Sequence, residues 1–238
     1  MIHYFGGFFQ GNFHKIMSGK HGFVSFANQQ HLQDMLNICQ SVSLDNGAYS
    51  LWKSRTKVNW EEYYEWVEGL KSHPRFDFAI IPDVIMGSEK ENDALLDKWP
   101  LSRSIGLPVW HMQESIERLK RLANEWEYIA IGGSNAYHHP GDGMWWAKMK
   151  QAMDAICDYD GRPICKIHGL AMLNSSIFTR LPLKSADSAH AAYKTAMNAP
   201  WTGPYAPVSR EMKACVIIER TEAFNSADHW SGLTPFKG

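Results

Sequence analysis

The segment FAIIPD, residues 78 to 83, contains the pattern that decides the fold of this chain. Its four leading apolar residues form a run of the length and composition of a short buried strand. Proline follows directly and ends the strand, because it has no N–H to donate to a strand ladder. Asp83 comes next, so the segment predicts a carboxylate just beyond the end of a buried strand.

Similar apolar runs recur along the chain. The predicted strands are Ile2–Phe5, Phe23–Phe26, Val42–Leu44, Phe78–Ile81, Pro108–Trp110, Tyr128–Ile131, Ile164–Ile167 and Leu183–Ala186. Segments with helical spacing lie between most of them, at His31–Gln40, Trp60–Lys71, Glu89–Lys98, Ser115–Asn124 and Met144–Tyr159. Strands that alternate with helices predict an α/β fold with a parallel sheet. Eight such strands in 238 residues predict one domain over residues 1–238, a single (β/α)8 barrel of the TIM type.

Two parts of the chain depart from this regular alternation. Residues 6–22 are rich in glycine and have little helical pattern, so we expect an irregular N-terminal loop there. The tail from Pro200 onward is also irregular, and residues 213–224 fit either a strand or a helix. The predicted barrel therefore carries an irregular loop near its start and an irregular tail at its end.

The composition excludes several classes of protein. Hydrophobic residues make up 45% of the chain, enough for a substantial core, which excludes a disordered protein. The formal net charge of −1 lacks the basic excess of a typical nucleic-acid-binding domain, so any phosphate contact must come from a local cluster. The cysteines are widely spaced, and we expect reduced thiols in a cytoplasmic protein without an export signal or a membrane span.

Polar or small residues follow most of the predicted strands. They are Asp45, Asp83, Gln113, the pair Gly132 and Gly133, His168, and Asp187. In a barrel of this class the carboxyl ends of the strands form the mouth where catalytic groups lie, so we expect these residues to converge. Each aspartate could instead be a helix N-cap or form an Asx turn. Three acids, an amide and a Gly-Gly pair in register favour a functional site.

Several of these segments resemble one known family. LDNGAYS, residues 44 to 50, resembles the D-S-G-G-F-Q segment of queuine/guanine tRNA transglycosylases. PDVI, the glutamine after PVWHM, AIGG and HGLA then follow in the order of that family's base-pocket segments, and SADS, residues 185 to 188, stands where the family has its nucleophilic aspartate. The resemblance covers about residues 40–190 and is closer to the short DpdA-type relatives of phages and bacteria, which insert 7-deazaguanines into DNA.

This chain differs from that family in two features, which change the metal and the polymer that we expect. The tRNA enzymes have a C-x-C-x-x-C…H zinc site after the barrel, whereas only Cys215 lies beyond Asp187 here. The arginine-bearing segment that holds RNA in the family is replaced by AHAAYKTAMN, residues 189 to 198. We therefore expect no zinc subdomain, no metal and no cofactor, and we expect DNA rather than tRNA as the polymer.

The resemblance also implies catalytic roles. Exchanging a base with retention at the sugar carbon C1′ requires two displacements, so a carboxylate must first form a covalent intermediate. The family's nucleophile position falls on Asp187, and Asp45 is then the expected general acid and base. The Asn46-Gly47 turn after Asp45 is expected to bring backbone N–H groups close to a flat ligand.

The remaining positions are expected to hold the base. Asp83 can accept the N1–H and 2-amino donors of guanine as a bidentate pair. Gln113 and the N–H groups of Gly132 and Gly133 are expected near the O6 atom, and Tyr49 and His168 are expected to stack on the two faces. Other interpretations stay open, because His168 and Tyr49 could be core residues and Gln113 could be an ordinary helix-capping partner.

The expected partners are DNA and a free 7-deazaguanine base of the preQ0 type. A guanine in duplex DNA must leave the stack before it reacts. The basic run KSRTK, residues 53 to 57, is expected either to hold nearby phosphates or to be a solvated loop. Three alternatives remain: exchange in tRNA, a barrel N-glycosidase or nucleoside hydrolase with water as the acceptor, and a barrel without catalysis that serves as a scaffold. The sequence predicts neither the oligomeric state nor the inserted base.

Overall fold

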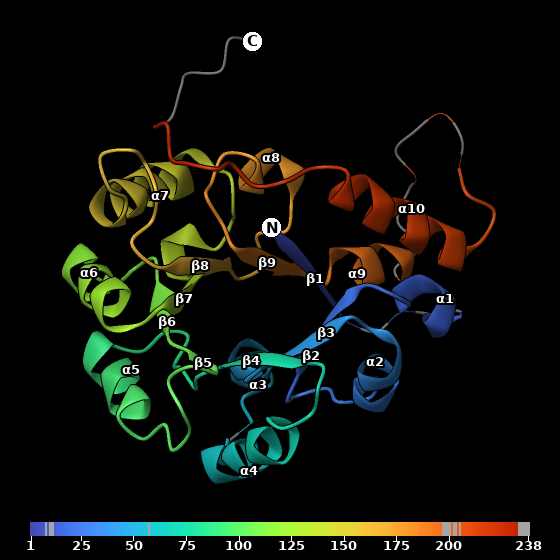
Figure 1. The fold of residues 1–238 in the computed structure, drawn as a ribbon, viewed down its shortest axis with the longest axis horizontal. Coiled ribbons are helices and arrows are strands. Elements are labelled where there is room, and N and C mark those ends of the chain that lie inside the picture. Colours follow the sequence, from blue (N-terminus) through green and yellow to red (C-terminus); the bar gives the residue numbers. More distant parts are fainter. Residues whose placement is uncertain are drawn as a thin grey trace.

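The centre of the molecule is a parallel sheet that curls into a nearly closed barrel (Figure 1). The computed structural model describes residues 1–7, 9, 12–56, 58–196, 201, 204 and 206–232. Within these residues the strands are β1 Ile2–Gly6, β2 His21–Ser25, β3 Ser41–Asp45, β4 Phe76–Ile80, β5 Gly106–Leu107, β6 Val109–His111, β7 Tyr128–Gly132, β8 Lys166–Gly169 and β9 Ser185–Ser188. Their order in the sheet is β5-β4-β3-β2-β1-β9-β8-β7-β6, and every paired neighbour is parallel.

The described residues form nine strands where the sequence predicts eight, and Pro108 is the reason. β5 and β6 are the two ends of the sheet order, yet only this proline separates them along the chain. The carbonyl of Leu107 accepts from Ile81 beside β4, at 2.9 Å, whereas the carbonyl of Pro108 accepts from Ala130 of β7, at 2.9 Å. The chain therefore changes its hydrogen-bonding partner from β4 to β7 at this point. Because proline has no N–H, the row of backbone hydrogen bonds is interrupted there.

The helices lie mostly outside the barrel (Figure 1). They are α1 Phe13–Met17, α2 Leu32–Ile38, α3 Ala48–Ser54, α4 Trp60–Leu70, α5 Glu89–Leu96, α6 Ile116–Glu125, η1 Asn135–Tyr137, α7 Gly143–Ile156, α8 Ser175–Phe178, α9 His190–Ala196 and α10 Arg210–Glu222. Side-chain caps fix several of their starts; Ser88 forms a capping box with Glu91, and Ser115 accepts from Arg118. In the view of Figure 1, α3 overlaps β4 and is drawn closer to the centre of the molecule than α4.

Some helices differ from the sequence-based expectation. The glycine-rich segment 6–22 contains α1, because Asn12 caps it by accepting from the N–H of Lys15. Residues 213–224, which fit either a strand or a helix, belong mostly to α10, which packs against α9 and α1. Beyond α10 the tail crosses to α7, where the Trp230 indole donates to Asp154 at 2.7 Å. Parts of the predicted irregular tail, residues 200, 202, 203, 205 and 233–238, lie outside the described residues.

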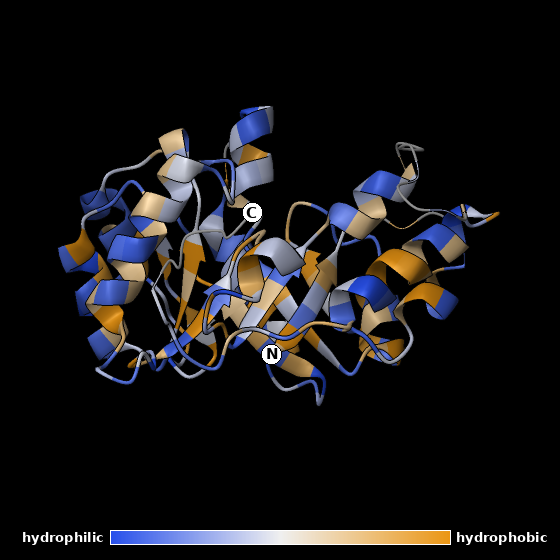
Figure 2. Cartoon of the chain, turned by 90° about the horizontal axis from the view of Figure 1, so that it is seen from above, coloured by the Kyte–Doolittle hydropathy of each residue, from blue (hydrophilic) through white to orange (hydrophobic). Residues whose placement is uncertain are grey.

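Side chains alternate between the inside and the outside of the barrel along each strand. Phe78 contacts Tyr4 on β1 with ring centroids 5.4 Å apart, and because β4 and β1 are not neighbours in the sheet, these rings meet across the interior. The interior cluster is Tyr4, Phe23, Phe78, Ile80, Leu107, Val109 and Ala130. Ala79 and Ile81 belong to the larger cluster between the sheet and the helices. Figure 2 shows the hydrophobic colouring concentrated on the strands.

Candidate functional site

A cavity of about 660 Å³ opens at the carboxyl ends of the strands. Small-molecule sites typically occupy ~300–1,000 Å³, and in barrels of this kind they lie at this end. Residues at or just beyond the ends of β1, β2, β3, β4, β6, β7, β8 and β9 line the cavity. Of the residues predicted to form the site, its lining includes Asp45, Tyr49, Asp83, Gly132, Gly133 and Asp187.

The alternation along the strands explains why polar side chains point into this cavity. Val109 belongs to the interior cluster, so His111, two residues further along β6, also faces inward. Ala130 and Gly132 are related in the same way on β7. The apolar interior therefore ends in a layer of polar and small residues at the mouth.

Asp45 is a partly buried carboxylate at the end of β3. Burial raises its pKa to about 7, and the nearby negative charges of Asp187 and Asp83 act in the same direction. The Ser25 hydroxyl and the N–H of Gly47 act in the opposite direction, and the latter donates to Asp45 Oδ2 at 3.2 Å. A carboxyl group with this pKa can both donate and accept a proton near neutral pH.

The Asn46-Gly47 turn has a structural cause that differs from the expected one. Gly47 has a φ of 75°, and a Cβ atom there would lie 2.9 Å from the Cβ of Ala27. Glycine is therefore required for the close approach of β3 and the β2 loop, and Gly47 itself does not line the cavity. The Asn46 side chain accepts from the N–H of Ala48 at 2.8 Å, which fixes the start of α3 directly over the site.

Asp187 lies in β9, and its carboxylate is held by the chain that follows β8. Its Oδ1 atom accepts from the N–H of Ala171 at 2.9 Å. Ala171 has a φ of 55°, which is unusual for a residue with a side chain and directs this N–H toward the carboxylate. Among the described residues no side chain or backbone group donates a hydrogen bond to Oδ2, so that oxygen is available at the cavity.

Asp83 is buried and both of its carboxylate oxygens have side-chain donors. Asn46 donates to Oδ1 at 2.6 Å, and His111 Nε2 lies 2.7 Å from Oδ2. An ionised carboxylate has about four acceptor positions, so each oxygen retains one for a ligand. Burial alone would lower the pKa of His111, but the hydrogen bond and charge of Asp83, with the charge of Glu114, raise it above the ordinary value.

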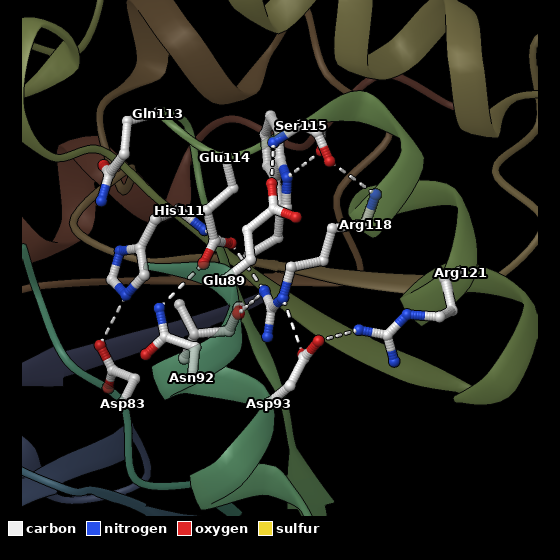
Figure 3. A network of polar contacts seen from close by, with 12 residues as sticks. Asp83, Glu89, Asn92, Asp93, His111, Gln113, Glu114, Ser115, Arg118 and Arg121 are labelled. Carbon is white, nitrogen blue, oxygen red and sulfur yellow. Dashed lines mark hydrogen bonds and ion pairs between the residues drawn. The ribbon is translucent and has the colours of Figure 1, made fainter. Parts of the chain in front are cut away.

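A polar network continues from His111 away from the cavity (Figure 3). Glu114 is 4% exposed; it accepts from the backbone N–H of His111 at 2.9 Å and from Arg118 at 2.6 Å. Asn92 donates to the other oxygen of Glu114 at 2.8 Å, and Arg118 also pairs with Asp93 at 2.9 Å. These contacts join α5 and α6 to the end of β6. The Asp83–His111 pair therefore rests on a continuous buried support.

Gly132 and Gly133 are both at the cavity, but for different physical reasons. A Cβ atom at Gly133 would lie 2.4 Å from the carbonyl oxygen of Tyr137, so the backbone there needs a glycine. A Cβ atom at Gly132 would meet Leu170 at 3.4 Å and His111 Nδ1 at 3.8 Å, which are ordinary or nearly ordinary contacts. Steric crowding from the rest of the chain does not require glycine at position 132.

Two predicted site residues lie outside the lining of the cavity. The side chain of Gln113 turns toward the loop after β4, where its Nε2 donates to the carbonyl of Ile85 at 3.2 Å. His168 is fully buried in the barrel interior, with its ring 5.4 Å from that of Phe23. Its Nδ1 contacts Ser185 at 2.5 Å and its Nε2 lies 3.4 Å from Asp187 Oδ1. His168 therefore supports Asp187 from below and does not have the position of a stacking residue.

The predicted stacking residue Tyr49 does lie at the cavity, on α3. It is 60% exposed, and its ring is 6.0 Å from that of Trp52, which is 51% exposed. Lys53 and Arg55 of the basic run follow at the end of α3 and are exposed, whereas residue 57 of that run lies outside the described residues. An aromatic pair and two cationic groups thus project beside the mouth.

The sequence interpretation missed two residues of this site. The sequence assigns Asn46 only to a turn, whereas its side chain donates to Asp83 and to the carbonyl of Ile81, at 2.6 and 2.9 Å. The sequence analysis predicts Gln113 at the site and does not predict His111. The period-two alternation of strand side chains could have identified it, because His111 has the same parity as the inward Val109.

The described residues contain no group of three or more His, Cys, Asp or Glu side chains that could hold a metal ion. In the same part of the chain, no helix combines the length and the apolar character needed to cross a membrane. Comparisons with models of protein families, with curated proteins and with solved structures give no match to this chain.

Proposed function

We propose that this protein is a base-exchange glycosyltransferase that replaces guanine in DNA with a 7-deazaguanine base. The main support is one observation: three carboxylates, Asp45, Asp83 and Asp187, share a single cavity at the carboxyl ends of the strands. Their surroundings differ, which is the arrangement expected when carboxylates divide the roles of acid, ligand and nucleophile. In this proposal β5 and β6 are one interrupted strand of an eight-stranded TIM-type barrel. The reaction takes place in the cytoplasm.

The reaction consists of two displacements at the sugar carbon C1′. In the first, Asp187 Oδ2 forms a bond to C1′ while the bond from C1′ to N9 of guanine breaks, and Asp45 supplies the proton that the departing base needs. In the second, the incoming base gives a proton to Asp45 and bonds to C1′ through N9, and the ester bond to Asp187 breaks. Two inversions leave the sugar with its original configuration.

Asp45 is suited to the proton transfers because its pKa is raised to about 7 by burial and by the neighbouring carboxylates. General acid–base catalysis is most effective when the pKa lies near the working pH. The free Oδ2 of Asp187 supports its role as nucleophile. The fixed carboxylate of Asp83 supports a role in binding the base.

The polymer is proposed from the surroundings of α3. The exposed rings of Tyr49 and Trp52 offer stacking surfaces, and Lys53 and Arg55 offer cations for phosphates. DNA is favoured over tRNA because the segment after Asp187 has no arginine and because a zinc-binding cysteine set is missing from the sequence.

The proposal is tested by exchange of labelled guanine into polymer. We expect label to enter DNA without loss of bases, and Asp187→Ala to abolish incorporation. Asp160→Ala removes an exposed acid in a turn at the other end of the molecule and is the matched control, with full activity expected. Entry into tRNA alone would correct the polymer. Abasic sites without incorporation would instead identify a glycosidase that uses water as the acceptor.

A further inference from the structure

A row of polar side chains leads through the barrel interior to Asp187. Tyr128 and Ser185 are the first residues of β7 and β9, and His168 lies beside Ser185 on β8. The Tyr128 hydroxyl lies 2.5 Å from Ser185 Oγ, which in turn lies 2.5 Å from His168 Nδ1. His168 Nε2 then lies 3.4 Å from Asp187 Oδ1. The four side chains therefore form one continuous row that ends at the cavity.

The alternation of side chains along the strands places this row inside the barrel. Ser185 and Asp187 are two residues apart on β9, so their side chains share one face of the strand. Tyr128 has the same relation on β7 to Ala130, which belongs to the interior cluster. His168 and Ser185 are both fully buried, so neither side chain exchanges its partner for solvent.

The direction of the hydrogen bonds follows from the far end of the row. Burial raises the pKa of Tyr128, the contact with Ser185 opposes that rise, and the charge of Asp77 adds to it, so the hydroxyl keeps its proton near neutral pH. Among the described residues its one hydrogen-bond partner is Ser185, which therefore accepts from it. The proton of Ser185 is then directed to its other partner, His168 Nδ1.

This direction puts a proton on the nitrogen of His168 that faces Asp187. A neutral imidazole that accepts at Nδ1 carries its proton on Nε2, and a doubly protonated ring carries one there as well. Only a neutral ring with its proton on Nδ1 would turn a lone pair toward the carboxylate, which is unfavourable at 3.4 Å. Nε2 is buried and has no hydrogen bond with any described residue, so its N–H is available to Asp187 Oδ1.

We propose that His168 is a positioning residue for the nucleophile, which presents Nε2–H to Asp187 Oδ1 and favours release of the carboxylate from the sugar in the second displacement. This inference rests on the proposed function and adds to it a residue that acts through Asp187. The resemblance implies a different role for His168, stacking on the base, which its buried position does not allow.

The second displacement breaks the ester bond between Asp187 Oδ2 and C1′ while N9 of the incoming base bonds to C1′. The electron pair of the broken bond returns to the carboxylate, and the proton of the base passes to Asp45. In the ester Oδ1 is an uncharged carbonyl oxygen, so a donor at Oδ1 stabilises the free carboxylate more than the ester. The N–H of Ala171, at 2.9 Å, is one such donor, and His168 Nε2–H is the second.

Removal of the second donor should therefore shift the enzyme toward the covalent adduct. The measurements are the ratio of adduct to free enzyme with labelled DNA, on a denaturing gel, and the rate at which the adduct disappears when excess guanine is added. His168→Leu should raise the ratio by about 10-fold and slow the disappearance, because one hydrogen bond to a charged group corresponds to about that factor. His168→Gln, whose amide nitrogen reaches about as far as Nε2, should restore the native ratio.

The far end of the row provides a variant that keeps an aromatic ring in the barrel interior. Tyr128→Phe removes only the hydroxyl that directs Ser185, so we expect a shift toward the adduct that is smaller than in His168→Leu. Tyr64→Phe is the matched control, because it removes a buried hydroxyl of α4 that has no hydrogen bond with any described residue. In the native protein without substrate, the ¹⁵N chemical shifts of the His168 ring should show a proton on Nε2.

The outcomes separate this inference from the proposed function. If the native protein forms the adduct and exchanges guanine, an unchanged ratio in His168→Leu or in Tyr128→Phe overturns the role of His168 and leaves the proposed function standing. An equal rise in Tyr64→Phe, or a neutral ring with its proton on Nδ1, has the same consequence. If His168→Leu does not fold, Tyr128→Phe and the ring nitrogen shifts decide the question. If the folded native protein forms no adduct with DNA, the proposed function and the inference fail together.

Discussion

The two sides of the cavity hold their carboxylates in different ways. On the side of β4 and β6, Asp83 accepts from Asn46 and from His111, and a buried network behind His111 extends to Arg118. On the side of β3 and β9, Asp45 and Asp187 each accept one hydrogen bond from a backbone N–H, with Ser25 and His168 as further neighbours. The first side is fully supported by side chains, and the second is not.

This difference is the one expected if the two sides of the mouth have different roles in the proposed reaction. A carboxylate whose oxygens are fixed by side-chain donors keeps its orientation, which suits the binding of a flat ligand. A carboxylate with few donors can gain a proton or form a bond at little cost to its surroundings. If this division between a supported side and a reactive side is real, substitutions on the two sides should have different effects.

The largest expected effect concerns the reactive side. Asp187→Ala should abolish a covalent complex with labelled DNA on a denaturing gel, because no oxygen remains to bond to C1′. Asp45→Ala should leave a faint band, because attack without proton transfer is slower by ~10²–10⁴-fold but still possible. A band that persists in Asp187→Ala and disappears in Asp45→Ala would reverse the two roles.

The next effect concerns the supported side. Glu114→Ala leaves Arg118 buried without its closest partner, at a contact of 2.6 Å in the native protein. Breaking a buried ion pair in this way should lower the free energy of unfolding by about 3–5 kcal/mol in urea titrations. Asp160→Ala, in an exposed turn, should change it by less than about 0.5 kcal/mol. Equal effects would mean that the network does not support the fold.

A smaller effect separates Asp45 from the other acids by its pH dependence. In the unfolded chain an aspartate has a pKa of about 3.9, whereas burial raises that of Asp45 to about 7 in the folded protein. The folded state thus binds the extra proton between these values, so the contribution of Asp45 to stability is lost as pH rises from 4 through 7. Asp45→Asn should be more stable than the native protein at pH 8, by a few kcal/mol, and similar at pH 4. Thermal melts at both pH values provide the check, and a constant difference would contradict a raised pKa.

The smallest expected effect concerns the exposed aromatic side chains of α3 beside the mouth of the cavity. Trp52→Ala should weaken the binding of single-stranded DNA by ~1–3 kcal/mol, the usual range for one stacked base, and leave the binding of free guanine unchanged. Tyr159 is 97% exposed in the turn before β8, far along the chain from α3, so Tyr159→Ala is the control and should have no effect. Fluorescence anisotropy with labelled DNA measures both. Equal loss in the two variants would remove α3 from the polymer site.

Most of the barrel could be predicted from the sequence because strands and helices there have clear periodicity. All of the expected strands overlap observed ones, and Pro108 accounts for the additional one. Short helices such as α1 and α3 were missed, because their starts depend on the capping side chain of Asn12 and on the left-handed backbone of Gly47 rather than on a repeated apolar face.

The sequence predicts a site residue correctly where its position along a strand decides that it lies at the cavity. It does not do so where packing against other side chains decides the orientation. Asp45, Asp83 and Asp187 line the cavity as expected from their places at strand ends. The orientation of Gln113 depends on the carbonyl of Ile85, and the depth of His168 depends on the rings around it. Contacts of this kind join segments that are distant in the sequence, so no local sequence pattern predicts them.

The interruption at Pro108 divides the chain into two half-barrels. β1 to β4 pair in one unbroken row and β6 to β9 in another, and the exposed turn at residues 102–104 precedes β5. A chain cut in that turn would yield one fragment with Asp45 and Asp83 and a second with His111 and Asp187, which rejoin through the β1–β9 and β4–β5 ladders. Neither fragment holds all of these side chains, so the candidate site would form only when the two halves close on each other.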